Sequence, residues 1–203
     1  MTALVISDAR IVNQQKYDEY RLALRSLLER HGARFLAHGQ EPEVVQGGWH
    51  PPRMSLIEFP SRDAVTALAA TDEYQAMQHT LANSAMMDMI VVDGVGPSMY
   101  AGTEAAPAYA VADTRIVNRQ AFEEYRVSIH AAMRVHRGRY LALTDQITTV
   151  AGNWAPPYLT VMEFPDRKAA LDAHSASRYQ ELRDLINNAA MIEMVLLIGG
   201  APG

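Results

Sequence analysis

The stretch Arg10-Ile11-Val12-Asn13 occurs twice in the chain, because it returns as Arg115-Ile116-Val117-Asn118. One offset of about 105 residues carries the first half onto the second without an insertion, and roughly a third of the aligned positions are identical. The other matching pairs are Glu19-Tyr20-Arg21 with Glu124-Tyr125-Arg126, Trp49-His50-Pro51-Pro52 with Trp154-Ala155-Pro156-Pro157, Glu58-Phe59-Pro60 with Glu163-Phe164-Pro165, and Tyr74-Gln75 with Tyr179-Gln180. The sequence therefore indicates a duplication and fusion. We expect a first repeat over residues 1–96, a linker over 97–107 and a second repeat over 108–203.

Hydrophobic periodicity changes in the same order within each copy. In the first copy, strands are predicted over residues 4–9, 34–38, 53–59 and 86–92. Asn13 is placed to cap a helix after the first strand, and Gly32 to end it. Two further helical segments are expected after Ser61 and over residues 73–82. This βαββαβ order is the ferredoxin-like plan of an α+β protein, whose sheet carries helices on one face only. The other face needs a partner, which the second copy can supply.

Composition limits the functions open to the chain. Its 203 residues are 49% hydrophobic and 20% charged, as in ordinary globular proteins, and the net charge of −5 argues against nucleic-acid partners and anionic membranes. The chain contains no cysteine, which removes disulfides and thiolate chemistry. The N-terminal residues do not resemble a signal peptide, and no apolar run reaches membrane-spanning length. We expect a cytoplasmic protein.

A resemblance to a known family rests on four parts of the first copy, namely His31-Gly32-Ala33-Arg34-Phe35-Leu36, Trp49, Ile57-Glu58-Phe59-Pro60-Ser61 and Glu73-Tyr74-Gln75. With these the copy resembles the domain of unknown function 1330 family, which belongs to the dimeric α/β-barrel superfamily. The second copy has Arg137 where the helix-ending glycine is expected. Ordinary members of the family resemble a single copy that pairs as a homodimer. The resemblance therefore implies an intrachain dimeric α/β barrel, with a further homodimer left open.

Related barrels include cofactor-independent oxygenases, polyketide cyclases and isomerases, so the resemblance implies a fold and no single chemistry. The sequence contains no phosphate-binding loop, nucleophile elbow or close-spaced metal pair. Neither a metal nor an organic cofactor is expected.

Charged residues fall on strands that ought to be buried. Asp8 and Arg10 share one face of the first strand, and Arg34 and Glu58 lie on the paired middle strands. Burying such groups is costly unless they pair. They are expected either to form an ion-pair network that holds the barrel together, or to anchor an anionic or carbonyl-bearing ligand. The second copy repeats them as Asp113, Arg115, Arg139 and Glu163.

Histidine distinguishes the two copies. His38 and His50 occur only in the first copy, whereas Leu143 and Ala155 stand at the matching positions of the second. Histidine is the natural general acid or base near neutral pH, so His38 and His50 are candidate catalytic residues. The difference directs attention to the first half of the chain.

The remaining histidines carry weaker predictions. His31, which recurs as His136, is expected to have a structural role at a helix end, where its charge suits the helix dipole. The spacing of His31, His38 and His50 is not that of a metal site. His130 and His174, which are unique to the second copy, are expected on helices and exposed.

Aromatic and acidic residues complete the candidates. Trp49 and Trp154 precede Pro-Pro in their copies and are expected either to plug a loop or to form a wall for a planar ligand. Tyr20, on the inner face of the first helix, is a candidate donor to a substrate oxygen. Asp88 and Glu193 place an acid on each last strand, where an apolar environment would raise its pKa.

These observations lead to one leading hypothesis and two alternatives. The leading hypothesis is a small-molecule enzyme of proton-transfer chemistry, a cyclase, isomerase or lyase acting on a carbonyl compound, plausible in specialised metabolism. His38 or His50 would be the acid or base, Arg34 and Tyr20 would stabilise oxyanion charge, and Asp8 or Glu58 would orient the arginine. Arg10, Arg139 and the two tryptophans would bind substrate. The alternatives are a non-catalytic ligand-binding or stress-related protein, and a cofactor-independent oxygenase.

Overall fold

The computed structural model of the chain describes residues 1–176 and 181–200. The first half contains β1 (Ala3–Ile11), α1 (Gln14–Arg30), β2 (Arg34–Gln40), β3 (Glu43–Gln46), β4 (Arg53–Phe59), α2 (Arg62–Ala69), α3 (Asp72–Ala82) and β5 (Ala85–Asp93). The second half contains β6 (Ala108–Ile116), α4 (Arg119–Val135), β7 (Arg139–Thr144), β8 (Ile147–Ala151), β9 (Leu159–Phe164), α5 (Arg167–Ser175), α7 (Arg183–Ala189) and β10 (Ala190–Ile198). The predicted pair Tyr179-Gln180 lies outside the described residues.

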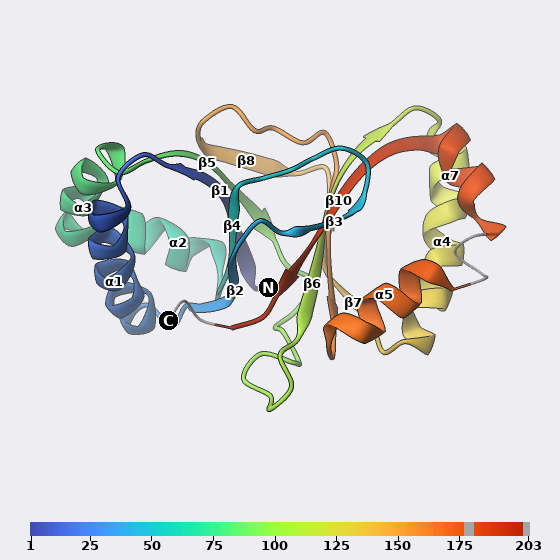
Figure 1. The fold of residues 1–203 in the computed structure, drawn as a ribbon, viewed down its shortest axis with the longest axis horizontal. Coiled ribbons are helices and arrows are strands. Elements are labelled where there is room, and N and C mark those ends of the chain that lie inside the picture. The colour runs from blue at the N-terminus through green and yellow to red at the C-terminus, as the bar shows by residue number, and fades with distance from the viewer. Residues whose placement is uncertain (177–180, 201–203) are drawn as a thin grey trace.

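Two five-stranded antiparallel sheets form the centre of the molecule, in the orders β2-β4-β1-β5-β8 and β3-β10-β6-β9-β7. Four strands of each sheet come from one repeat, in the order expected of a ferredoxin-like unit. The sheets face each other, and the helices cover their outer faces (Figure 1). The predicted packing of two tandem α+β units as an intrachain barrel is therefore confirmed.

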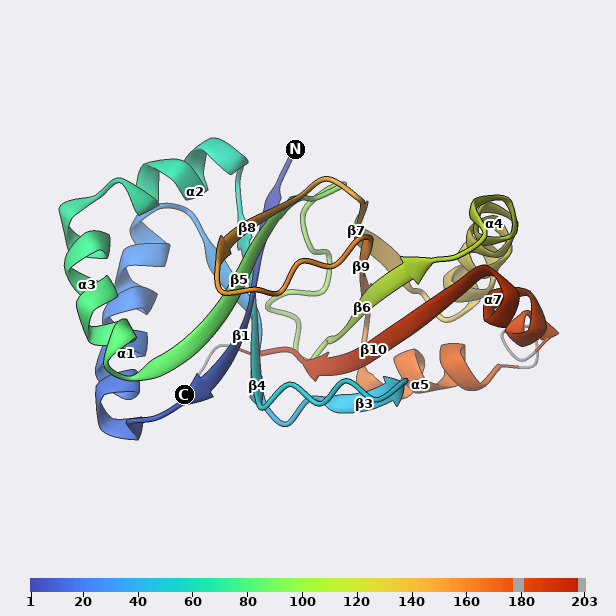
Figure 2. The same ribbon diagram turned by 90° about the horizontal axis from the view of Figure 1, so that it is seen from above.

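The fifth strand of each sheet comes from the other repeat, which the sequence analysis missed. Strand β3 of the first repeat pairs with β10, and β8 of the second pairs with β5. Figure 2 shows these two strands reaching across to opposite edges of the molecule. The exchange ties the repeats together through main-chain hydrogen bonds, so neither sheet is completed by its own half.

Burial explains the alternation along the strands. Leu4 and Ile6 of β1 point into the space between the sheets, whereas Val5 and Ala9 point toward the helices. Strand β4 is buried along its whole length because both of its faces are covered. The molecule therefore has three hydrophobic layers, one between the sheets and one between each sheet and its helices.

Local sequence sets the helix ends. Asn13 accepts a hydrogen bond from the backbone of Lys16, and Asn118 caps α4 in the same way. Gly32 follows α1 with a φ of +67°, as the sequence predicts. The matching Arg137 adopts a φ of +58°, a left-handed conformation that costs a non-glycine residue about 1 kcal/mol. Within the described residues, no helix is long and apolar enough to cross a membrane.

Candidate functional site

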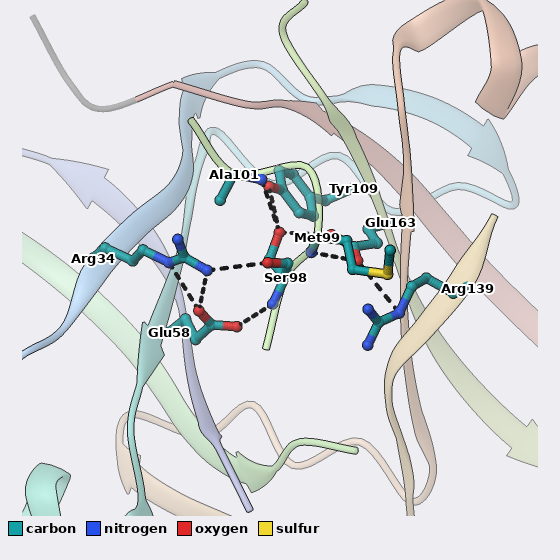
Figure 3. Close-up of polar contacts among 8 residues, drawn as sticks. All are labelled: Arg34, Glu58, Ser98, Met99, Ala101, Tyr109, Arg139 and Glu163. Atoms are coloured by element: carbon teal, nitrogen blue, oxygen red, sulfur yellow. Dashed lines mark hydrogen bonds and ion pairs between the residues drawn. The ribbon is translucent and has the colours of Figure 1, made fainter. Parts of the chain in front are cut away.

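The paired charges of the middle strands hold the linker. Glu58 lies 2.7 Å from Arg34 and accepts a 2.6 Å hydrogen bond from the backbone N–H of Ser98. Glu163, which is fully buried, accepts hydrogen bonds from the Ser98 hydroxyl at 2.6 Å and from the Met99 backbone at 3.0 Å. Figure 3 shows the two glutamates on opposite sides of this segment. Of the two roles expected for these residues, an ion-pair network or a ligand anchor, these contacts agree with the ion-pair network.

The two arginines differ in their share of this network. Arg34 also donates to the Ser98 carbonyl at 3.2 Å, whereas Arg139 lies 3.4 Å from Glu163 (Figure 3). Both guanidiniums are thus engaged with the glutamate of their own repeat.

The two tryptophans meet between the sheets. The rings of Trp49 and Trp154 are 5.2 Å apart, and both pack against the inter-sheet core. Trp154 donates its indole N–H to Asp113 at 3.0 Å. The loops that carry the tryptophans are anchored on the opposite repeat. Glu193 accepts from the backbones of Gly48 and Trp49, and Asp88 from those of Asn153 and Trp154.

Asp8 and Asp88 face each other across β1 and β5, beside Arg10, in an open hollow of about 230 Å³. Burial, and then the charge of Asp88, raise the pKa of Asp8, and burial likewise raises the pKa of Asp113. This hollow is separate from the helix-facing layers in which Tyr20 and His38 lie.

His38 belongs to a polar cluster between the first sheet and its helices. Its Nδ1 lies 2.6 Å from the Ser55 hydroxyl, and its Nε2 lies 3.3 Å from Nη1 of Arg53. The Arg53 guanidinium lies 5.6 Å from the centre of the Tyr17 ring. Burial, followed by the charges of Arg53 and Arg21, lowers the pKa of His38 to about 4, so the ring is neutral at pH 7.

The other predicted catalytic residues lie apart from this cluster. His50 is exposed in the loop before β4, and Arg34 is held at the linker. Tyr20 is buried in the helix-side core, where burial raises the pKa of its phenol. The structure thus does not bring the predicted residues into one site. Their catalytic roles remain predictions.

A cavity opens in the second half, between the sheet and helices α4 and α5. Its volume is about 60 Å³, which exceeds the room that one water needs. Its walls are mostly aliphatic and aromatic, and Val45 of the exchanged strand β3 contributes to them. Small-molecule sites are usually lined by apolar side chains together with a few polar groups.

Small side chains create this cavity. Ala110, Ala170 and Ala173 line it, whereas Val5, Val65 and Leu68 stand at the matching positions and pack into the core of the first half. The histidine differences between the copies directed the prediction to the first half, and these alanines were not among the predicted residues. Their spacing on α5, set against Val65 and Leu68 on α2, is the signal that could have revealed the cavity.

Six polar side chains also line the cavity, namely Thr114, Tyr125, Arg126, Tyr140, Thr160 and His174. Burial raises the pKa of Tyr140 to about 12, so its phenol stays protonated at neutral pH. Arg126 is held by Glu123, which accepts from its Nε at 2.8 Å. His174 lies on α5 as predicted, but it is half-buried at the cavity wall, so its predicted exposure is wrong. The turn of α5 directs it inward beside Ala170 and Ala173.

No cluster of three or more histidine, aspartate or glutamate residues suited to a metal occurs in the described part of the chain.

Comparisons with known proteins agree with the duplication. A model of the family described as domain of unknown function DUF1330 matches residues 2–95 and again residues 107–200. A comparison with curated protein sequences gives no match.

Solved structures of similar fold extend over both halves. A proposed monooxygenase from Lactobacillus acidophilus NCFM is 11% identical, covers 99% of this chain and 98% of its own, and gives a TM-score of 0.57. A proposed monooxygenase from Fusobacterium nucleatum is 12% identical over 98% of this chain and 92% of its own, with a TM-score of 0.55. An anthrone oxidase-like protein is 6% identical over 98% and 91%, with a TM-score of 0.53. At these identities the likeness establishes the fold.

Proposed function

The chain belongs to the DUF1330 family in each of its halves, and from that premise we propose that it is a small-molecule enzyme whose substrate occupies the cavity of the second half. The observation that carries the proposal is the apolar cavity itself, with Arg126, Tyr140 and His174 on its wall. The apolar walls suit the body of a small organic molecule, and the three polar groups suit one oxygen-bearing end of it.

The chemistry that these groups support best is proton transfer next to a carbonyl. A neutral His174 imidazole would remove a proton from the carbon beside the carbonyl group. The charge that develops on the carbonyl oxygen would be stabilised by the Tyr140 phenol, which remains a donor because its pKa is about 12, and by the Arg126 guanidinium. Among the described residues that line the cavity, no carboxylate competes with His174 as the base.

Deuterium exchange tests this chemistry before the natural substrate is identified. A panel of small cyclic and aromatic ketones is incubated with the protein in D₂O, and mass spectrometry follows exchange at the carbon beside the carbonyl. We expect exchange well above the buffer rate for the ketones that bind. His174→Gln should abolish the excess, and Ala173→Leu, which fills the cavity, should abolish binding as well. Binding without any excess exchange would instead support the alternative of a non-catalytic binding protein.

The placement of the reaction at His38 or His50 remains a prediction of the sequence, and the same assay separates the two placements. His38→Leu introduces the residue that the second half carries at this position. If the second-half cavity is the site, this variant retains exchange. Loss of exchange in His38→Leu, with full exchange in His174→Gln, would return the reaction to the first half.

A cofactor-independent oxygenase is the second candidate. A substrate deprotonated in an apolar cavity would lie in surroundings that also admit oxygen, and relatives of the same fold are described as proposed monooxygenases and as anthrone oxidase-like. Oxygen consumption with any compound that exchanges deuterium, compared with an anaerobic incubation, distinguishes an oxygenase from an enzyme that only transfers protons.

A further inference from the structure

The first half contains a buried arginine without an acidic partner. Arg53 is 7% exposed, and no carboxylate in the described part of the chain lies within ion-pair distance of its guanidinium. Its guanidinium lies beside the His38 ring and over the Tyr17 face. Asp8, which lies on the neighbouring strand, accepts from the backbones of Arg53 and Ala9, and among the described residues no ion pair joins it to the Arg53 guanidinium. A buried cation without a counter-charge is costly, because no opposite charge offsets its lost hydration.

The hydrogen bonds around Arg53 fix which atoms donate and which accept. A guanidinium can only donate, so Nε2 of His38 must accept, and the proton of the neutral ring lies on Nδ1. Nδ1 therefore donates to Ser55 at 2.6 Å, which leaves the Ser55 hydroxyl hydrogen available to donate elsewhere. In this group of Arg53, His38 and Ser55, the hydrogen-bonding positions that are left for a ligand are therefore donors.

Arg21 of α1 is a second cation whose charge acts on the same group. The charge of Arg21 lowers the pKa values of both His38 and Tyr17, as that of Arg53 does. Asp18 lies 3.5 Å from Arg21, is partly buried, and is the acidic residue that influences Tyr17. Arg53 therefore supplies a positive charge that no ion pair with a described carboxylate offsets, and it lies beside the half-buried ring of His38.

We propose that Arg53, His38, Ser55 and Arg21 form an oxyanion-binding site in the first half, distinct from the second-half cavity, for a small molecule that carries a carboxylate or phosphate group. The planar fork of Arg53 suits two oxygens of such a group, and the Ser55 hydroxyl and Arg21 suit a further one. The second half has Tyr158, Leu143 and Thr160 in place of Arg53, His38 and Ser55, so it lacks this site.

A titration of the intact protein with inorganic phosphate, and separately with acetate, tests the site. The ring protons of His38 are followed by NMR, and sodium chloride at equal ionic strength is the control. We expect a saturable shift of the His38 resonances and a rise of its pKa with at least one oxyanion. Saturation by acetate indicates a carboxylate ligand, and saturation by phosphate alone indicates a phosphate ligand. No response beyond that to chloride with either ion would overturn the proposal.

Variants then locate the binding. Arg53→Met should weaken binding at least tenfold and Arg21→Gln severalfold, whereas Arg25→Gln, on an exposed position of the same helix, should leave it unchanged. If Arg53→Met does not fold, Ser55→Ala replaces it, with severalfold weaker binding expected. An unchanged dissociation constant in Arg53→Met, or in Ser55→Ala where that variant is used, would also overturn the proposal.

Discussion

The two halves of this molecule share one plan and differ in what lies between sheet and helices. In the first half, Leu68 and Val65 reach from α2 into that layer, whereas the matching Ala173 and Ala170 leave room in the second half. The exchanged strands differ in the same sense, since Val45 lines the second-half cavity and the matching Val150 is 52% exposed. A few large-to-small differences within the same fold are thus enough to distinguish a packed core from a candidate site.

The largest loss of stability is expected when a large side chain is removed from the packed layer of the first half. Leu68 is 3% exposed, so Leu68→Ala should lower the free energy of unfolding by about 2–4 kcal/mol through lost contacts and a new cavity. The matched change in the open half, Ala173→Leu, enters existing space and should alter stability by about 1 kcal/mol or less. Urea unfolding of both variants measures the difference. Equal destabilisation by both would mean that the two layers are equally packed.

The next largest losses of stability are expected where the two tryptophan loops are anchored, and the two loops should differ. An added Cβ at Gly152 would lie 2.8 Å from the Cα of Asp88, a backbone atom that cannot move aside. At Gly47 the three atoms nearest to the added Cβ all belong to the carboxylate end of Glu193, with Cδ at 2.6 Å. Both glycines have positive φ, so both alanine variants are strained.

We therefore expect Gly152→Ala to cost about 2–3 kcal/mol and Gly47→Ala about 1–2 kcal/mol. Thermal unfolding of the two variants gives the comparison. A larger loss for Gly47→Ala would contradict the account of how each loop is anchored.

A smaller effect concerns pH and again separates the halves. The pKa of His38 is lowered from 6.5 to about 4 in the folded protein, so the unfolded chain binds more protons between these values. The stability that the neutral ring contributes is present above pH 6.5 and is lost as the pH falls toward 4, by about 1–2 kcal/mol after allowance for partial exposure. His38→Leu, the second half's own residue, should remove this part of the pH dependence. Unfolding curves at pH 7 and pH 4.5 measure it, and an unchanged slope in the variant would exclude His38 as its source.

Much of the fold could be predicted from the sequence, because the same pattern of strands and helices occurs in both repeats at one constant offset. Strands β3 and β8 were missed because they are short and pair with the other repeat, so neither has a local pattern of its own. The sequence also placed Arg34 with Glu58 correctly, since the cost of burial requires a partner. That the Ser98 segment of the linker binds both Glu58 and Glu163 follows only from the tertiary structure.

The candidate site was harder to predict, for a physical reason. His38 and His50 attract attention because their chemistry is visible in the sequence, whereas an alanine at a core position has no chemical signature. Ala110, Ala170 and Ala173 leave space because their side chains are small. This space remains a cavity only if the surrounding residues do not move in to fill it.

In the second half the layer between sheet and helices holds an open cavity, whereas the matching layer of the first half is packed. Xenon binds to apolar cavities, so crystals of the protein pressurised with xenon test it directly. We predict xenon density between α5 and the second sheet, absent from the equivalent layer of the first half and lost in the Ala170→Val, Ala173→Leu double variant. Equal occupancy in both halves, or density that persists in the double variant, would contradict the account.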